Sequence, residues 1–149
     1  VPRLHMHLVS QAHIPYTVIM NSADNISKIA GGFPSPADDY MDLRLDLQQY
    51  LIKHPAATFY MRAAGDSMRE AGILDGDLLI VDRSLTPKTG SIVIVPINGE
   101  LMLKRLKIHH GQAFLCPANR DQPTIAISDL QGFEFWGVVI YAIHDLRVS

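Results

Sequence analysis

Short apolar segments separated by turn residues recur from Ala57 to the end of the chain, and they constrain the fold more than any other feature. They have the length of strands and are rich in β-branched and aromatic residues, whereas helical periodicity is nearly absent among them. The predicted strands are Thr58–Arg62, Asp77–Val81, Ser91–Ile97, Glu100–Leu106, Ala113–Cys116, Thr124–Ile127 and Phe135–Ile143. We therefore predict a compact, mostly β domain.

The dipeptide Asn98-Gly99 is the strongest short-range signal among these segments. Asparagine followed by glycine favours the two-residue turn of a β-hairpin, because both positions need a positive φ. The turn would fold the strand that carries Lys104 back onto Ile92–Val95. The sequence thus predicts where one unusual lysine lies.

Before the strands, Asp46-Leu47-Gln48-Gln49 has the pattern of a helix N-cap. A short helix is predicted through Lys53, where His54-Pro55 ends it. Alternating apolar residues from Met41 to Leu47 favour an extended approach to this helix, and Tyr16–Met20 is a possible further strand.

Length and charge limit the classes of protein that this chain can belong to. Its 149 residues suffice for one domain and an arm, with enough core to need no disulfide or metal. A net charge of −2 argues against a general nucleic-acid surface, so no sequence-specific DNA binding is expected. No apolar run reaches the length of a membrane span. We expect a cytoplasmic protein that does not contact a membrane.

The single cysteine and the seven histidines do not form a predicted site. Cys116 follows a strand-like run, which favours a buried structural role over that of a nucleophile. His5-x-His7 and His109-His110 lack the Cys, Asp or Glu partners at ligand spacing that zinc sites use. We predict neither a metal nor another cofactor.

Ser67 lies in the segment Gly65-Asp66-Ser67-Met68, at the start of a predicted helix. One interpretation is structural, because Ser67 and Glu70 have the spacing of a capping box. The other is chemical, because a serine activated by a neighbouring base can attack an amide carbonyl. The backbone N–H groups of Asp66 and Ser67 would then hold the oxyanion that forms. The two interpretations are compatible.

Lys104 is the candidate base. Residues alternate across a strand, so Lys104 shares a face with Met102, Leu106 and Ile108. A lysine among apolar neighbours can extend its ammonium group to water. If the amine is instead buried, desolvation lowers its pKa and makes the neutral amine available as a general base. Sequence spacing alone does not show that Ser67 and Lys104 meet.

The segment Gly31-Gly32-Phe33-Pro34-Ser35-Pro36 has the composition of a linker. Proline blocks regular pairing and glycine keeps the backbone accessible, which is where proteolysis concentrates. The segment is either an ordinary connection between arm and domain or a strip that the Ser-Lys pair cuts.

Several of these motifs together resemble a known family, the UmuD-like SOS mutagenesis proteins among the LexA-like self-cleaving serine peptidases. The resemblance extends from about Gly32 to the last strand. Its densest parts are Gly32-Phe33-Pro34-Ser35-Pro36-Ala37, Gly65-Asp66-Ser67-Met68, Asp75-Gly76-Asp77-Leu78-Leu79-Ile80-Val81-Asp82 and Lys104-Arg105-Leu106.

The resemblance implies that Ser67 is the nucleophile and Lys104 the general base, and that Gly31-Gly32 is the scissile bond. Residues 1–31 would be an arm removed by self-cleavage, and residues 32–149 a LexA-like serine peptidase domain with short helices. Relatives usually carry alanine or cysteine before the scissile bond, so cutting at Ala30-Gly31 is the alternative.

The resemblance also implies partners. Members form homodimers, and RecA filaments on single-stranded DNA stimulate their self-cleavage. The processed form would be the accessory subunit of an error-prone translesion DNA polymerase whose catalytic subunit belongs to the Y family. Two alternatives remain at this point. One is the dimerisation and self-cleavage domain of a LexA-type or phage repressor without its DNA-binding head, and the other is a signal-peptidase relative acting on other chains.

Overall fold

The computed structural model of the chain describes residues 4–5, 45–118 and 123–147. The possible strand Tyr16–Met20, the segment Gly31–Pro36 and most of the extended approach before Asp46 lie outside these residues. Among the described residues, no helix is long and apolar enough to cross a bilayer.

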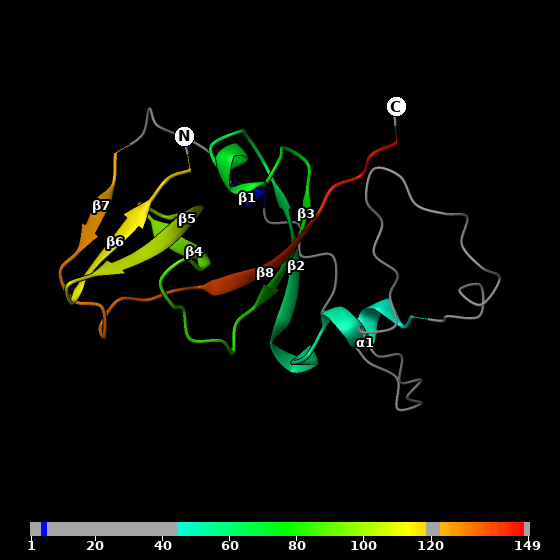
Figure 1. Cartoon of the computed structure of the whole chain (residues 1–149), viewed down its shortest axis with the longest axis horizontal. Helices are drawn as coiled ribbons and strands as arrows, with labels where there is room; N and C mark the ends of the chain where they lie inside the picture. Colours follow the sequence, from blue (N-terminus) through cyan, green and yellow to red (C-terminus); the bar gives the residue numbers. More distant parts are fainter. Residues whose placement is uncertain (1–3, 6–44, 119–122, 148–149) are drawn as a thin grey trace, which may run out of the picture.

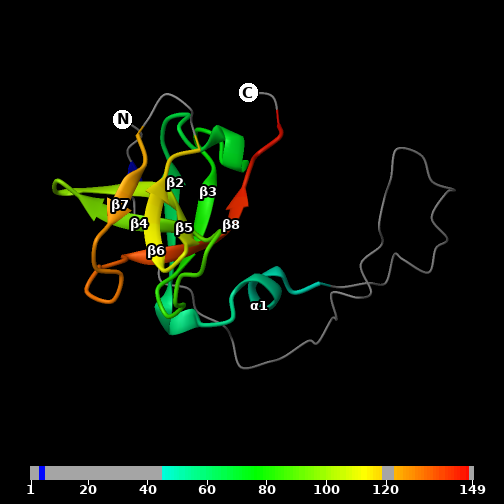
Figure 2. The same cartoon turned by 60° about the vertical axis from the view of Figure 1, so that its left-hand side comes forward.

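Eight strands form one antiparallel sheet with the order β1-β2-β3-β8-β4-β5-β6-β7. Figure 1 and Figure 2 show that the sheet is strongly twisted, with β8 and β4 in its middle and β6 and β7 at one end. The strands are β1 (Leu4–His5), β2 (Thr58–Ala63), β3 (Leu78–Asp82), β4 (Ile92–Ile97), β5 (Glu100–His109), β6 (Gln112–Cys116), β7 (Ile125–Ile127) and β8 (Gly137–Ile143). The prediction of a mostly β fold is confirmed.

All seven predicted strands are present, and all but one of their ends lie within two residues of the predicted positions. The largest difference is β5, which continues three residues beyond Leu106 to His109 because β6 pairs along it there. The strand β1 was not predicted, since two residues carry no detectable periodicity.

The short helix before the sheet is α1 (Leu47–Leu51). Asp46 is its N-cap as predicted, and its side chain accepts a hydrogen bond of 3.2 Å from the Gln49 N–H. The helix ends two residues before Lys53, so the predicted end is wrong. The chain there already turns into the 3₁₀ helix η3 (Pro55–Ala57), and Pro55 supplies its fixed φ at the first position.

The hairpin between β4 and β5 forms as predicted. Asn98 and Gly99 have φ values of 51° and 78°, which are the positive angles that this turn type requires. In the resulting register Val93 lies opposite Lys104. The hairpin therefore fixes the position of Lys104 through local turn chemistry.

Buried apolar side chains form two main clusters along the sheet. The first includes Met61, Leu79, Ile94 and Leu103 from β2 to β5. The second is built mainly from β4, β5, β6 and β8. A smaller cluster joins Ile52, just after α1, to Ile80. Burying such a side chain contributes about 1.5–3 kcal/mol, so these clusters fix the framework on which the candidate site stands.

Candidate active site

Ser67 lies in the turn between β2 and β3, and hydrogen bonds within the turn hold its shape. Gly65 has a φ of 87°, which an L side chain rarely adopts. Its N–H donates to Asp75 Oδ1 over 2.8 Å. The N–H of Leu74 donates to Asp77 Oδ2, also over 2.8 Å. These bonds place Ser67 on a constrained loop directly after β2.

The Ser67 side chain is buried, with 2% of its surface exposed, and its Oγ has no hydrogen-bond partner among the described residues. The capping-box interpretation is therefore wrong. The helix that follows is the three-residue 3₁₀ helix η4 (Arg69–Ala71), and its N-cap is Met68, which makes no side-chain cap bond. So short a helix also adds little macrodipole at the serine. A buried hydroxyl without a partner costs stability, which favours a chemical role.

The backbone next to Ser67 offers free donors. Within the described part of the chain, neither the Asp66 N–H nor the Ser67 N–H donates a hydrogen bond. The Asp66 carbonyl accepts from the Arg69 N–H over 3.1 Å. A hollow of about 180 Å³ lies beside this turn and is lined by Asp66, Arg69, Leu74 and Asp75. The arrangement leaves two adjacent N–H groups available to an anion.

Lys104 is buried in the middle of β5, with only 3% of its surface exposed. Burial lowers the pKa of its amine, and electrostatic attraction from Cys116 opposes part of that shift. The interpretation in which the ammonium group reaches water is therefore wrong. Met102 and Leu106 on the same face are buried as predicted, whereas Ile108 is 37% exposed. The amine is thus held where its neutral form is favoured.

The segments that carry Ser67 and Lys104 contribute to one part of the core. Met68, directly after the serine, and Leu103, directly before the lysine, belong to the same buried cluster. No hydrogen bond joins Ser67 Oγ to a described residue, so the hydroxyl and the amine are not in direct bonding contact. The predicted scissile residues Gly31 and Gly32 lie outside the described residues.

Two buried carboxylates that sequence reasoning did not single out flank β3, and each contacts a histidine. Asp82 Oδ2 is 2.6 Å from His54 Nδ1, and Asp77 Oδ1 is 2.7 Å from His144 Nδ1. Both carboxylates are at most 2% exposed. The alternation of apolar residues along β3 does not predict these two pairs, because each histidine comes from a segment that is distant in the sequence. These pairs join the ends of β3 to the residues after α1 and after β8.

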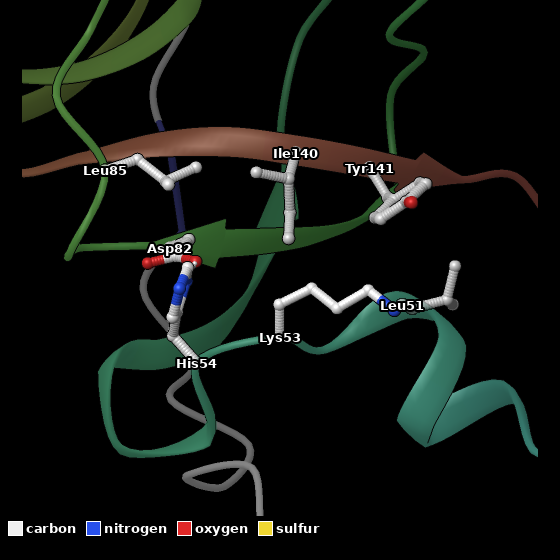
Figure 3. A pocket seen from close by; sticks show the side chains of 7 residues that line it. All are labelled: Leu51, Lys53, His54, Asp82, Leu85, Ile140 and Tyr141. Carbon is white, nitrogen blue, oxygen red and sulfur yellow. Dashed lines mark hydrogen bonds and ion pairs between the residues drawn. The ribbon is translucent and has the colours of Figure 1, made fainter. Parts of the chain in front are cut away.

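The pair His54–Asp82 lies at the edge of a hollow of about 260 Å³ between the end of α1 and β8. Figure 3 shows the His54 ring directed at the Asp82 carboxylate, with Ile140 and Tyr141 on the opposite wall. The residues that line this hollow come from the end of α1 and from strands of the sheet. We therefore interpret the contacts here as those that attach α1 to the sheet.

Cys116 is half-buried, which corrects the prediction of a buried position. It is the last residue of β6, where pairing with Arg105 leaves it near the end of the sheet. Within residues 4–5, 45–118 and 123–147, no three His, Cys, Asp or Glu side chains are grouped so that they could hold a metal ion.

The chain is similar to several known proteins. The family model described as Peptidase S24-like matches residues 24–140. Protein MucA of Escherichia coli is 43% identical over 119 residues, covering 79% of this chain and 81% of MucA. Protein SamA of Salmonella typhimurium is 48% identical over 116 residues, covering 78% of this chain and 80% of SamA. The LexA repressor of Paracidovorax citrulli is 31% identical over 137 residues, covering 91% of this chain and 61% of the repressor.

The chain belongs to the Peptidase S24-like family, and its resemblance to the UmuD-like members is confirmed. This membership supports the prediction of a self-cleaving serine peptidase.

Proposed function

We propose that the protein cleaves its own N-terminal arm by means of a Ser67–Lys104 dyad. The observation that carries the proposal is the burial of both groups, the serine hydroxyl without a described partner and the amine with a lowered pKa. Neither state has a structural benefit, since an unpartnered hydroxyl and a buried lysine both cost stability. Membership of a peptidase family supplies the reaction class.

In the proposed reaction, the neutral Lys104 amine takes the proton of Ser67 Oγ while the oxygen bonds to the Gly31 carbonyl carbon. The N–H groups of Asp66 and Ser67 hold the resulting oxyanion. The Gly31-Gly32 bond then breaks, and the protonated lysine returns its proton to the departing Gly32 nitrogen. Water hydrolyses the ester on Ser67, which releases residues 1–31 and leaves residues 32–149 as the product. Ala30-Gly31 is the proposed minor cleavage position.

The reaction requires the hydroxyl and the amine to approach one another. The turn that carries Ser67 would have to move for this, and the shared cluster of the neighbouring residues Met68 and Leu103 favours such an approach. Catalytic hydrogen bonds are often long before substrate is in place. A substrate segment, or a stimulating partner that favours the closed arrangement, would therefore control the rate.

The proposal includes a role in the SOS response. The relatives MucA and SamA, at 43% and 48% identity, are more similar to this chain than the LexA repressor at 31%. We propose that RecA filaments on single-stranded DNA stimulate cleavage, and that the processed homodimer is the accessory subunit of a Y-family translesion polymerase. Because these partners act on DNA, the proposal places the protein in the cytoplasm.

A second candidate is the dimerisation and self-cleavage domain of a LexA-type repressor. The LexA repressor match favours it, because it covers 91% of this chain. Both candidates predict the same cut. They differ in the processed product, which should bind a Y-family polymerase subunit only in the first case.

Mass spectrometry of the purified protein, incubated with and without RecA filaments, tests the proposal. We expect two fragments separated at Gly31-Gly32, formed faster with filaments, and none from Ser67→Ala. Cleavage by the alanine variant at the normal rate would reject the dyad. Co-purification of residues 32–149 with a Y-family catalytic subunit tests the accessory role.

A further inference from the structure

The strand β1 places an N-terminal segment of the chain against β2, which leads into the turn that carries Ser67, and against β5, which carries Lys104. Leu4 pairs with Ala63 and His5 with Arg62, antiparallel to the last residues of β2. The same strand also contacts β5, which carries Lys104. In Figure 1, β1 is the short blue strand next to β2. It is the edge strand of the sheet.

The edge that β1 covers leads directly into the candidate site. Ala63 is the last residue of β2 and stands four positions before Ser67. Its N–H donates to the Asp77 carbonyl and its own carbonyl accepts from Gly76, both on the β3 side. Backbone groups alternate along a strand, so those of Arg62 are directed away from β3, to the edge. Without β1, that edge would present an unpaired donor and acceptor beside the nucleophile.

Such an edge is suited to binding an extended peptide by strand addition. A peptide that is to be cut by Ser67 must also be extended there. The segment before the predicted scissile bond, Ile26-Ser27-Lys28-Ile29-Ala30, contains no proline and two β-branched isoleucines. The segment after it has two prolines within five residues and pairs poorly. The residues preceding the bond are therefore the natural competitors for this edge.

We infer that the edge of β2 at Arg62–Ala63 is a peptide-docking surface, and that the N-terminal residues Leu4–His5 occupy it in competition with the cleavable segment. The inference rests on the proposed self-cleavage and adds a means of restraining it. While β1 is paired, Leu4–His5 occupy this edge and exclude the cleavable segment from it. Release of β1 frees the edge for the residues that precede Gly31.

Substitution of His5 tests the competition. His5→Pro removes the N–H that pairing with Arg62 uses, while His5→Ala keeps it and serves as the matched control. We expect His5→Pro, and a chain that lacks residues 1–5, to cleave itself about three- to ten-fold faster than the parent, the factor expected for one or two lost backbone hydrogen bonds. His5→Ala should cleave at the parent rate. Equal or slower cleavage by His5→Pro and by the shortened chain would overturn the inference.

Hydrogen exchange provides a test that does not need activity. In the Ser67→Ala background, the Arg62 amide should be protected from exchange, and His5→Pro should reduce that protection, whereas His5→Ala should not. A synthetic peptide of residues 1–7, added to the shortened chain, should restore the protection. An Arg62 amide that exchanges equally in all three proteins would reject the docking surface, whatever the cleavage rates. Absence of any cleavage in the parent, with protection as expected, would reject the proposed function instead.

Discussion

Met68 and Leu103 pack in one buried cluster, although they are 35 positions apart in the chain. One follows Ser67 and the other precedes Lys104, so the turn after β2 and the middle of β5 are anchored in the same part of the core. No hydrogen bond joins Ser67 Oγ to Lys104. The relative position of the two side chains is therefore set by the packing of the apolar residues around them. Apolar packing can therefore hold in place both a hydroxyl without a described partner and a buried amine.

The first prediction concerns Ser67. Ser67→Ala should abolish self-cleavage and leave the free energy of unfolding unchanged or slightly raised, by up to about 1 kcal/mol, because the hydroxyl has no described partner to lose. Intact-mass measurement and urea unfolding check the two parts. A helix cap would behave differently, since its removal costs about 1 kcal/mol.

The second prediction concerns the position of the cut. The main fragments should comprise residues 1–31 and 32–149, with cleavage at Ala30-Gly31 in the minority. Gly31→Ala should reduce that minor product, because a side chain before the bond limits the backbone conformations of the segment. The masses and amounts of the fragments show which bond is cut and in what proportion. A main cut inside the sheet would contradict the assignment of residues 32–149 to one domain.

The strands could be predicted because each carries its own signal. Alternating apolar residues marked β5, and Asn98-Gly99 determined its hairpin with β4. Ser67 and Lys104 were identified as candidates from local motifs. Their burial was not predictable from spacing, because it depends on the packing of Met68 and Leu103 across the sheet.

Other features were not predictable because they depend on contacts between distant segments. His54 and Asp82 are 28 positions apart, and only the docking of α1 brings them together. The strand β1 has two residues and exists only through its pairing with β2. The predicted helix after Ser67 failed for a related reason. The turn from Gly65 to Gly76 is held by side-chain bonds to Asp75 and Asp77 and leaves room for a single 3₁₀ turn.

The third prediction concerns Asp82. Burial raises the pKa of its carboxyl group, but hydrogen bonds from Ser84 and His54 outweigh this effect and hold the pKa below its usual value. A carboxylate with a lowered folded-state pKa stabilises the protein above the unfolded-state pKa of 3.8, and that stability is lost as the pH falls through the folded-state pKa. Asp82→Asn should therefore cost about 1–3 kcal/mol at pH 7 and less below pH 3.8.

Urea unfolding at several pH values checks this prediction, and Asp145→Asn is the control. Asp145 bonds to Arg147 over 2.8 Å, but both side chains are exposed, so their pair contributes little. If both variants lost equal stability at pH 7, burial of Asp82 would not be the cause.

The last prediction uses pH to test Lys104 in two ways. A general base must be deprotonated, so self-cleavage without RecA should rise with pH through the lowered folded-state pKa of Lys104 and then level off. Lys104→Ala should lack this rise. Lys104→Arg should be inactive at every pH, because a guanidinium group does not give up its proton in this range.

The same pKa shift makes a prediction about stability that is independent of catalysis. The folded state binds the Lys104 proton more weakly than the unfolded state, so wild-type stability should rise with pH between the lowered folded-state pKa and the unfolded-state value of 10.5. Lys104→Met should be more stable than wild type at pH 7, by about 1.4 kcal/mol for each pKa unit of the shift. That advantage should shrink over the same pH window and be gone above 10.5, because the amine is then neutral in both states. Lys107→Met is the matched control, since Lys107 lies on the same strand but is exposed to water. An unchanged difference between Lys104→Met and wild type from pH 7 to pH 11 would mean that the amine is not desolvated, and would remove the physical basis for its role as a base.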